Sequence, residues 1–327
     1  MKLYNFLKSI YIYFFGSIAF YNAHKMSCKN IVFYNNYHNG DIHYSREFIK
    51  HIINCLPNKT YYYIHHNSKR ILLDIESLTF KIPDLIIKKW KKNKLDTYKM
   101  DINTNLLRSK DTLFINTWIG SNKGQYLQLY NGCTIQANYY LFKKILSELG
   151  ISNMDGIAKY IPILNFNKYE VGRVDNFMSS NKQMKIFISN GDCLSNQAEN
   201  FDMSPIINKL CNNYNKCLFL ISNKNENLNS NLKNLVYTSD IIAISDNDLP
   251  ENSYISTFCD IIIGRGSGAY CFTTIQDNWN SKKIICFSKN KEEGLWAENS
   301  SAIHSNSSDS KIVYEIISKE ISNLEGI

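Results

Sequence analysis

Short apolar runs alternate with segments of helical periodicity along the first half of the chain. Residues 30–35, 61–64 and 113–118 are rich in apolar and aromatic side chains, which predicts short strands buried on both faces. Residues 45–56 place apolar side chains every three or four positions, and this period predicts a helix. A second helix is predicted over residues 135–150, where the final glycine is a typical C-cap.

The same alternation restarts after a polar segment at residues 160–182, which we interpret as the link between two halves. Strands are predicted at residues 185–190, 217–221, 235–237, 241–244, 260–264 and 283–287. Helices are predicted at residues 201–214, 268–277 and 310–324.

Buried strands that alternate with helices predict a parallel α/β sheet, and two such series predict two Rossmann-like domains. The length of 327 residues agrees, because it exceeds what one hydrophobic core usually organises. We therefore expect an N-terminal apolar and aromatic helix at residues 1–27, a first sheet domain at 28–168, and a second sheet domain with a terminal helix at 169–327.

Residues 10–23 are apolar and aromatic, but fourteen residues are fewer than the ~20 that span a bilayer. The segment lacks the small-residue pattern of a signal-peptide cleavage site. Two interpretations stay open: a helix packed on the protein, or a peripheral contact with a membrane interface. Either agrees with a cytoplasmic protein, in the second case at the inner face of a membrane.

Composition excludes collagen-like and disordered classes, since 44% of the residues are hydrophobic. The net charge of +8 suits phosphate-bearing ligands, acidic glycans, anionic lipids or nucleic acid. The basic residues 88–94 fit either a polyanion contact or a solvated helix end. Nine scattered cysteines, without a Cys-x-x-Cys pair, indicate thiols in a reducing compartment and predict no structural zinc, and we expect no bound metal or cofactor.

Ligands of open α/β sheets bind in the turns that follow the strands, so these turns carry the candidate chemistry. In the first half, Gly40 and Asp41 follow the first predicted strand. Asp41 is a candidate general base that removes a proton from an attacking hydroxyl, or else a cap of the following helix. His38, Ser45 and Arg46 are candidate acceptor contacts, although Arg46 also fits an ion pair with a nearby acid.

In the second half a glycine-rich turn follows the strand at residues 260–264. Its backbone N–H groups and the dipole of the following helix would face an anion, and the alternative is a tight strand-to-helix connection. The candidate donor contacts in this turn are Arg265, Gly266, Ser267, Gly268 and Ala269.

Two further loops supply candidate contacts to a nucleotide-sugar donor. The loop after the strand at 185–190 offers Asn190, Ser195 and Gln197, unless it is an ordinary polar loop. The segment after the last strand contains Trp296, which fits stacking on a base or plain packing, and Glu298, which fits binding to hydroxyls.

These motifs resemble the GT-B glycosyltransferases, and most of all the ADP-heptose–lipopolysaccharide heptosyltransferase family. Gly40-Asp41 corresponds to the Gly-Asp near the N-terminus of that family, and residues 260–268 to its Asp-apolar-apolar-Gly strand with a Ser-Gly turn. The resemblance implies two domains facing across a cleft, Asp41 as catalytic base, and Ser267, Gly268 and Ala269 at the donor diphosphate. Gly40 is a further candidate donor contact, because a glycine lets the backbone approach a ligand closely.

Two departures from the family pattern bear on the donor. Residues 270–272 are Tyr-Cys-Phe, where the family has a histidine after Ser-Gly. The loop after the first strand of the second domain lacks the family lysine, and Ser195, Gln197 or Asn200 are the candidates to replace it.

The resemblance implies a glycosyltransferase of the hexosyl or heptosyl type that transfers a sugar from a nucleotide-sugar donor to a hydroxyl of a surface glycan or lipid-linked saccharide. It implies a metal-independent and inverting reaction. Two alternatives stay open: a nucleic-acid-binding protein or sugar transferase acting on DNA bases, for which the basic residues 88–94 would be the footprint, and a non-catalytic nucleotide-sugar-binding protein. We do not expect nucleic acid to be the partner.

Overall fold

The computed structural model describes residues 28–95, 105–120, 134–151, 161–194, 197–244, 248–266, 268–279, 281–289 and 302–326. The chain divides into two compact units, Met1–Pro162 and Ile163–Ile327. This division falls within the predicted link and a few residues before the predicted boundary at 168. The predicted helix at 1–27 lies outside the described residues.

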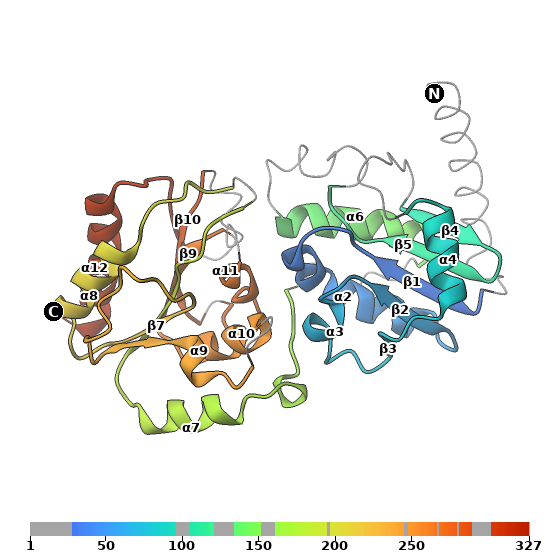
Figure 1. The fold of residues 1–327 in the computed structure, drawn as a ribbon. Coiled ribbons are helices and arrows are strands. Elements are labelled where there is room, and N and C mark those ends of the chain that lie inside the picture. The colour runs from blue at the N-terminus through green and yellow to red at the C-terminus, as the bar shows by residue number, and fades with distance from the viewer. Residues whose placement is uncertain are drawn as a thin grey trace. The chain divides into compact units, whose positions relative to one another are not determined.

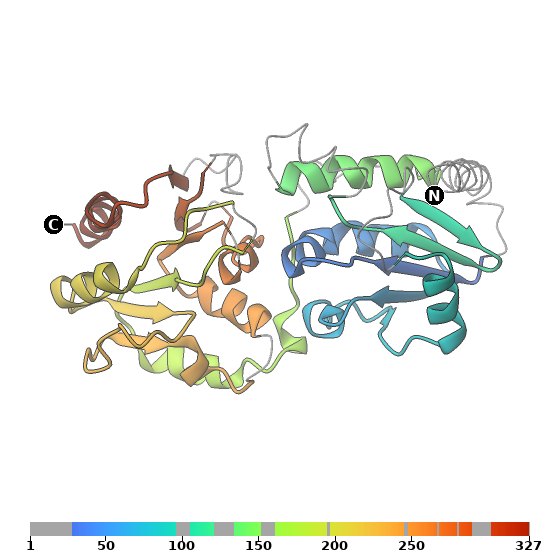
Figure 2. The same ribbon diagram turned by 45° about the horizontal axis from the view of Figure 1, so that its top comes forward.

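Unit 1 is built on a five-stranded sheet with the order β3-β2-β1-β5-β4, in which only the edge strand β4 is antiparallel (Figure 1). Helices α2 and α6 lie side by side on one face, where Phe48 stacks on Phe142 with ring centroids 4.4 Å apart (Figure 2). Helix α4 covers the other face. The elements are β1 (Asn30–Tyr34), α2 (Asn39–Cys55), β2 (Thr60–Ile64), α3 (Ser68–Ile71), β3 (Leu78–Thr79), α4 (Asp84–Lys92), β4 (Leu106–Ser109), β5 (Thr112–Asn116) and α6 (Thr134–Glu148).

Unit 2 is built on a six-stranded, all-parallel sheet with the order β8-β7-β6-β9-β10-β11. Numbered within the unit, this order is 3-2-1-4-5-6, that of a Rossmann fold. The elements are η2 (Phe166–Lys168), α7 (Gly172–Ser180), β6 (Lys185–Ser189), α8 (Ser204–Asn213), β7 (Leu218–Ile221), β8 (Leu235–Tyr237), α9 (Thr238–Ile241), α10 (Leu249–Thr257), β9 (Ile261–Arg265), α11 (Ala269–Phe272), β10 (Lys283–Phe287), β11 (Ala302–Ser305) and α12 (Ser310–Glu325).

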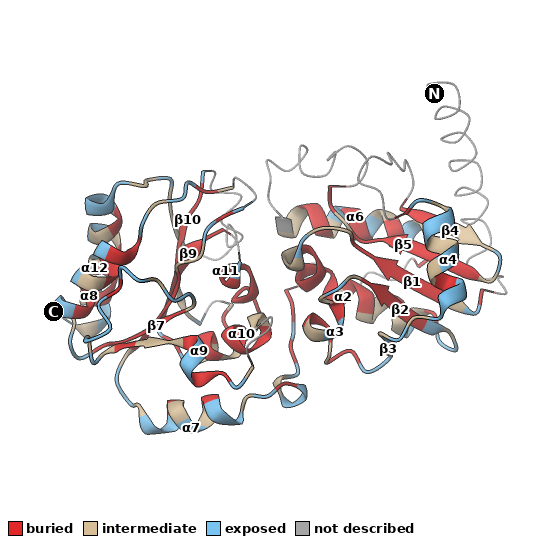
Figure 3. Cartoon of the chain, viewed as in Figure 1, coloured by how far each residue is buried: buried red, intermediate tan, exposed pale blue. Residues whose placement is uncertain are grey.

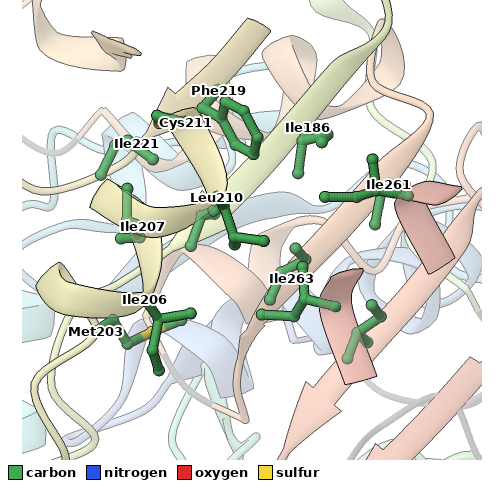
Figure 4. Close-up of a cluster of buried hydrophobic side chains, with 14 of the residues drawn as sticks. Ile186, Met203, Ile206, Ile207, Leu210, Cys211, Phe219, Ile221, Ile261 and Ile263 are labelled. Atoms are coloured by element: carbon green, nitrogen blue, oxygen red, sulfur yellow. The ribbon is translucent and has the colours of Figure 1, made fainter. Parts of the chain in front are cut away.

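Burial explains why the apolar runs form these strands. The residues of β5, β6, β7 and β9 are all buried, as expected for parallel strands covered on both faces (Figure 3). On one face of the unit 2 sheet, Leu210 of α8 packs over isoleucines of β6 and β9 (Figure 4). Ile317 of α12 belongs to the same core cluster. The Rossmann-like α/β prediction is therefore confirmed.

Several predicted elements differ from the structure. Residues 241–244 do not form a strand, because α9 ends at Ile241 and the buried Ile242 follows it as irregular backbone. The predicted link contains helix α7. The helix predicted at 45–56 begins at Asn39, six residues earlier, because the polar side chains of its first two turns are buried and hide the amphipathic period.

Candidate functional site

In unit 1 the strand order changes direction between β1 and β5, so the turns after these strands meet at one edge of the sheet. The two turns are built alike. Asn35 accepts a hydrogen bond from the backbone N–H of Tyr37 at 2.8 Å, and Asn116 accepts one from that of Trp118 at 3.1 Å. The rings of Tyr37 and Trp118 contact each other, with centroids 3.8 Å apart. The two turns thus form an aromatic surface where ligands of α/β sheets bind.

Asp41 lies directly after this turn, in the first turn of α2, and is 5% exposed. Burial raises the pKa of its carboxyl to about 7, while the side-chain amide of Asn35 has a smaller effect in the opposite direction. The interpretation of Asp41 as a helix cap is wrong, because the capping position is that of His38. A carboxyl with a pKa near neutrality is suited to general acid–base chemistry.

Buried polar side chains surround Asp41. The hydroxyl of Tyr63 lies 2.7 Å from that of Thr117, and Ser45 donates a hydrogen bond to the carbonyl of Ile42 at 2.8 Å. Burial raises the pKa of Tyr63, and the charge of Asp41 contributes in the same direction. Ser45 is fully buried, and its role as an acceptor contact stays a prediction.

Arg46 is also fully buried, and its guanidinium forms an ion pair with Asp74 and donates to the carbonyl of Ile71. This corresponds to the alternative in which Arg46 pairs with a nearby acid, so we leave Arg46 out of the proposed site. Among the predicted acceptor contacts, His38 is exposed, beside the ring of Tyr37 at a centroid distance of 6.1 Å.

In unit 2 the strand order changes direction between β6 and β9. Gly264 of β9 has no room for a side chain, because a Cβ atom there would lie 2.8 Å from Tyr270 and 3.0 Å from Ser189. The hydroxyl of Ser189 accepts a hydrogen bond from the backbone N–H of Tyr270 at 3.1 Å. The glycine therefore permits the short helix α11 to pack tightly on β6 and β9.

The turn at 266–269 differs from the prediction in one respect. Helix α11 has only four residues, so few peptide dipoles add up behind the turn and the predicted help from a helix dipole is wrong. Gly268 has φ +56°, a conformation that favours glycine, and is exposed, whereas Gly266 and Ala269 are buried. Ser267 lies outside the described residues.

Arg265 does not point a free charge at a ligand. Its guanidinium donates hydrogen bonds to the carbonyls of Asn190 at 2.6 Å, Phe201 at 3.0 Å and Gly191 at 3.1 Å, and it lies 3.6 Å from Asp192. Arg265 thus fastens the loop after β6 to the end of β9, and its direct contact to the donor phosphates stays a prediction.

A cavity of about 390 Å³ lies at this loop, at the ends of β6, β7 and β9. Asn190 lines it, and its side-chain amide bridges to the backbone of Asn223 after β7, at 2.9 Å in both directions. Asp202 lines it as well and accepts a hydrogen bond from the N–H of Ser204 at the start of α8. The cavity is lined chiefly by side-chain amides and carboxylates, together with Arg265.

The other predicted donor contacts are Gln197, Gly40, Ser195, Trp296 and Glu298, and the structure describes the first two of them. The carbonyl of Gln197 accepts a hydrogen bond from the N–H of Lys289, which joins the loop to the end of β10. Gly40 lies in the first turn of α2 in unit 1. Ser195, Trp296 and Glu298 lie outside the described residues.

Sequence analysis missed several residues of these two sites. Thr117 and Trp118 were placed inside the strand predicted at 113–118, whereas β5 ends at Asn116, so in the structure they belong to the turn after the strand. Asn225 and Asn227 line the cavity after β7, and the asparagine-rich turn that contains them was visible in the sequence.

Within the described ranges, no group of three or more histidine, cysteine, aspartate or glutamate side chains could hold a metal ion. No helix in that part of the chain is both long and apolar enough to cross a membrane.

Comparison with known proteins gives a fold but no sequence relative. No protein-family model and no curated protein matches the sequence. A solved structure of a glycosyl transferase family 9 protein from Veillonella parvula is similar at a TM-score of 0.52 and 12% identity, over 90% of this chain and 91% of that one. The E. coli heptosyltransferase WaaC, solved with ADP-2-deoxy-2-fluoro heptose, is similar at a TM-score of 0.52 and 9% identity, over 89% of this chain and 99% of that one.

The fold is that of the GT-B glycosyltransferases. The resemblance predicted from the sequence is thereby confirmed at the level of fold. The departure at residues 270–272 has a structural basis in this GT-B chain, because Tyr270, Cys271 and Phe272 are all buried beneath the turn. They pack the short helix α11 in the place where the family has a histidine.

Proposed function

We propose that this GT-B chain is a glycosyltransferase that moves a sugar from a nucleotide-sugar donor to a hydroxyl acceptor, with Asp41 as the general base. The observation that carries the proposal is the buried carboxyl of Asp41, with a pKa of about 7, at the point of unit 1 where the strand order changes direction. Of the two solved proteins described above, one carries a glycosyl transferase name and the other is a heptosyltransferase solved with an ADP-sugar analogue.

The reaction balances as a single displacement. Asp41 takes the proton of the acceptor hydroxyl, the acceptor oxygen forms a bond to the anomeric carbon, and the bond from that carbon to the nucleotide phosphate oxygen breaks. The nucleoside diphosphate leaves with the electron pair, and backbone N–H groups of the turns after β6 and β9 would stabilise its charge. Direct displacement inverts the configuration. Inversion and metal independence rest on the sequence resemblance, as does a surface glycan or lipid-linked saccharide as acceptor.

The pH dependence of turnover follows from the raised pKa of Asp41. The base must be deprotonated, so we expect the transfer rate at saturating substrates to rise with pH, to reach half its plateau near pH 7, and to be lost as Asp41 is protonated below it. Initial rates between pH 5 and pH 9 measure this. A rate that stays constant from pH 5 to pH 9 would contradict the assignment of the base.

A binding measurement tests the donor half of the proposal. We expect one of UDP, GDP, ADP or CMP to raise the melting temperature of the full chain, because a ligand that binds only the folded state stabilises it. Inorganic pyrophosphate at the same concentration is the control, because it separates nucleoside recognition from general anion binding. If none of the four nucleotides stabilises the chain, the donor half of the proposal fails.

A further inference from the structure

Asn35, which directly follows β1, places a second buried polar side chain at the site of Asp41. Asn35 is 1% exposed, and its side-chain oxygen accepts the hydrogen bond from the backbone N–H of Tyr37 at 2.8 Å. Because this bond fixes the oxygen on the turn, the NH₂ group at the other end of the same amide points away from the turn. The structure therefore holds a buried hydrogen-bond donor in a fixed orientation.

The turn does not use this NH₂ group. Its nitrogen is buried and makes no hydrogen bond of normal geometry with any described residue, yet the amide acts on the carboxyl of Asp41 and favours its charged form. A buried donor without a partner lowers the stability of the fold, and a hydrogen bond to a carboxylate is among the strongest that it can form. The charged form of Asp41 would therefore supply the partner that the amide lacks.

The hydroxyl groups around Asp41 donate their protons to other acceptors. Thr117 donates to the carbonyl at the end of β1 at 3.2 Å. A hydroxyl has a single proton, so Tyr63 must be the donor in its contact of 2.7 Å with Thr117. Ser45 donates to a carbonyl of its own helix at 2.8 Å. Of these four neighbouring side chains, Asn35 is the one that keeps a donor for the carboxylate.

Titratable groups on the elements packed around Asp41 do not take over this role. Burial and the amide of Asn35 are the influences on the pKa of Asp41 within the described part of the chain. The guanidinium of Arg46 is paired with Asp74, and on α6 the ammonium of Lys144 lies 3.8 Å from a carboxylate oxygen of Glu148. The other titratable groups on these elements are His43 on α2, Tyr63 on β2 and Arg70 on α3.

We propose that Asn35 is a positioning residue for Asp41, and that its side-chain amide donates a hydrogen bond to the carboxylate when Asp41 is in its charged, proton-accepting form. The inference rests on the proposed function, because it takes Asp41 to be the general base. The hydrogen bond stabilises the charge that burial disfavours, so a larger fraction of the base is ready to accept a proton near neutral pH. It also holds the carboxylate in one orientation.

Two variants remove the donor in different ways. Asn35→Ala removes the whole amide, whereas Asn35→Asp keeps an oxygen for the N–H of Tyr37 and so preserves the turn. We expect Asn35→Ala to raise the pKa of Asp41 by about one pH unit, the equivalent of one hydrogen bond to a charged group. Asn35→Asp should raise it at least as far, because a second carboxylate disfavours the charge of the first.

Two measurements on the full chain read this change. Carbon-13 labelling of the aspartate carboxyl groups lets NMR follow the titration of Asp41 directly, and Asp41→Asn identifies its signal. The midpoint of the pH dependence of transfer should move by the same amount, so turnover of Asn35→Ala at pH 7 falls about fivefold. The affinity for the donor nucleotide should stay unchanged, because the proposed donor contacts belong to unit 2.

Asn116→Ala is the matched control, because it removes the corresponding hydrogen bond to the N–H of Trp118 in the turn after β5. It should leave the pKa of Asp41 unchanged. The inference is overturned if both Asn35 variants leave that pKa unchanged, or if Asn116→Ala moves it as far. If the pKa moves in the Asn35 variants but transfer does not depend on it, Asn35 still positions the carboxyl, and the proposed role of Asp41 as the base is what fails.

Discussion

Asp41→Asn is expected to lower the rate of sugar transfer by about 10²–10⁴-fold, the range that a positioned general base contributes. Asparagine has the shape of aspartate but cannot take the acceptor proton. The donor nucleotide should still bind with unchanged affinity, because the proposed donor contacts in the turns after β6 and β9 belong to unit 2. Initial rates and calorimetric titration with the nucleotide, both on the purified chain, separate the two effects.

The same variant is expected to lose turnover but to gain thermal stability. The pKa of Asp41 is raised from 3.8 to about 7 in the folded state, so the stability that its neutral form gives is lost as the pH rises from about 4 to 7, and the cost of its buried charge is complete above pH 7. Asp41→Asn should therefore melt at a higher temperature than the parent chain at pH 8, although its turnover is much lower.

The control for the turnover measurement is Asp111→Asn, at a half-exposed carboxylate paired with Lys89, which should retain full turnover. Turnover of Asp41→Asn within a few-fold of the parent removes Asp41 from catalysis.

The second large effect concerns the buried ion pair between Arg46 and Asp74. Asp74→Ala is expected to lower the free energy of unfolding of unit 1 by about 3–5 kcal/mol, because it leaves the guanidinium of Arg46 buried without its partner carboxylate. Urea unfolding of the full chain, followed by circular dichroism, measures the change.

Two controls make this prediction specific. Glu47→Gln breaks the partly exposed pair with Lys50 on the same helix and should cost only about 0.5 kcal/mol. The double variant Arg46→Met with Asp74→Leu should regain most of the loss, because an apolar pair replaces both charges. If Asp74→Ala unfolds at the same urea concentration as Glu47→Gln, the buried pair does not hold unit 1 together in the way described.

Strands were predictable in this chain because their physical signature is local. Parallel strands covered on both faces need continuous apolar runs, and β6, β7 and β9 show them directly in the sequence. The start of α2 was not predictable in this way. Asp41, His43 and Ser45 are polar yet buried, so the helical period of apolar residues begins only after them.

The position of the candidate base was predictable, but the roles of the nearby arginines were not. Asp41 follows Gly40 after a strand, and that local order was enough to select it. Arg46 finds its partner in Asp74, and Arg265 finds carbonyls at residues 190, 191 and 201. These partners are 28 to 75 positions away along the chain, so no local pattern specified them.

Arg265 shows that a charged side chain in a candidate site can have a structural role, here in holding a loop. Its side chain is 2% exposed and holds the loop that lines the cavity at the end of β6. The sequence showed a positive charge next to glycines and suggested contact with phosphate. In the structure the guanidinium binds backbone carbonyls, and Arg265 lines the cavity together with side-chain amides and carboxylates.

The most direct test of the account is the release of nucleoside diphosphate from a panel of nucleotide sugars, measured with the purified chain and a mixture of saccharide acceptors. We expect release from at least one donor by the parent chain, and little or none from the same donor by Asp41→Asn, which still binds the nucleotide. Equal release by the two proteins, or no release from any donor by a chain that binds none of the nucleotides, would contradict it.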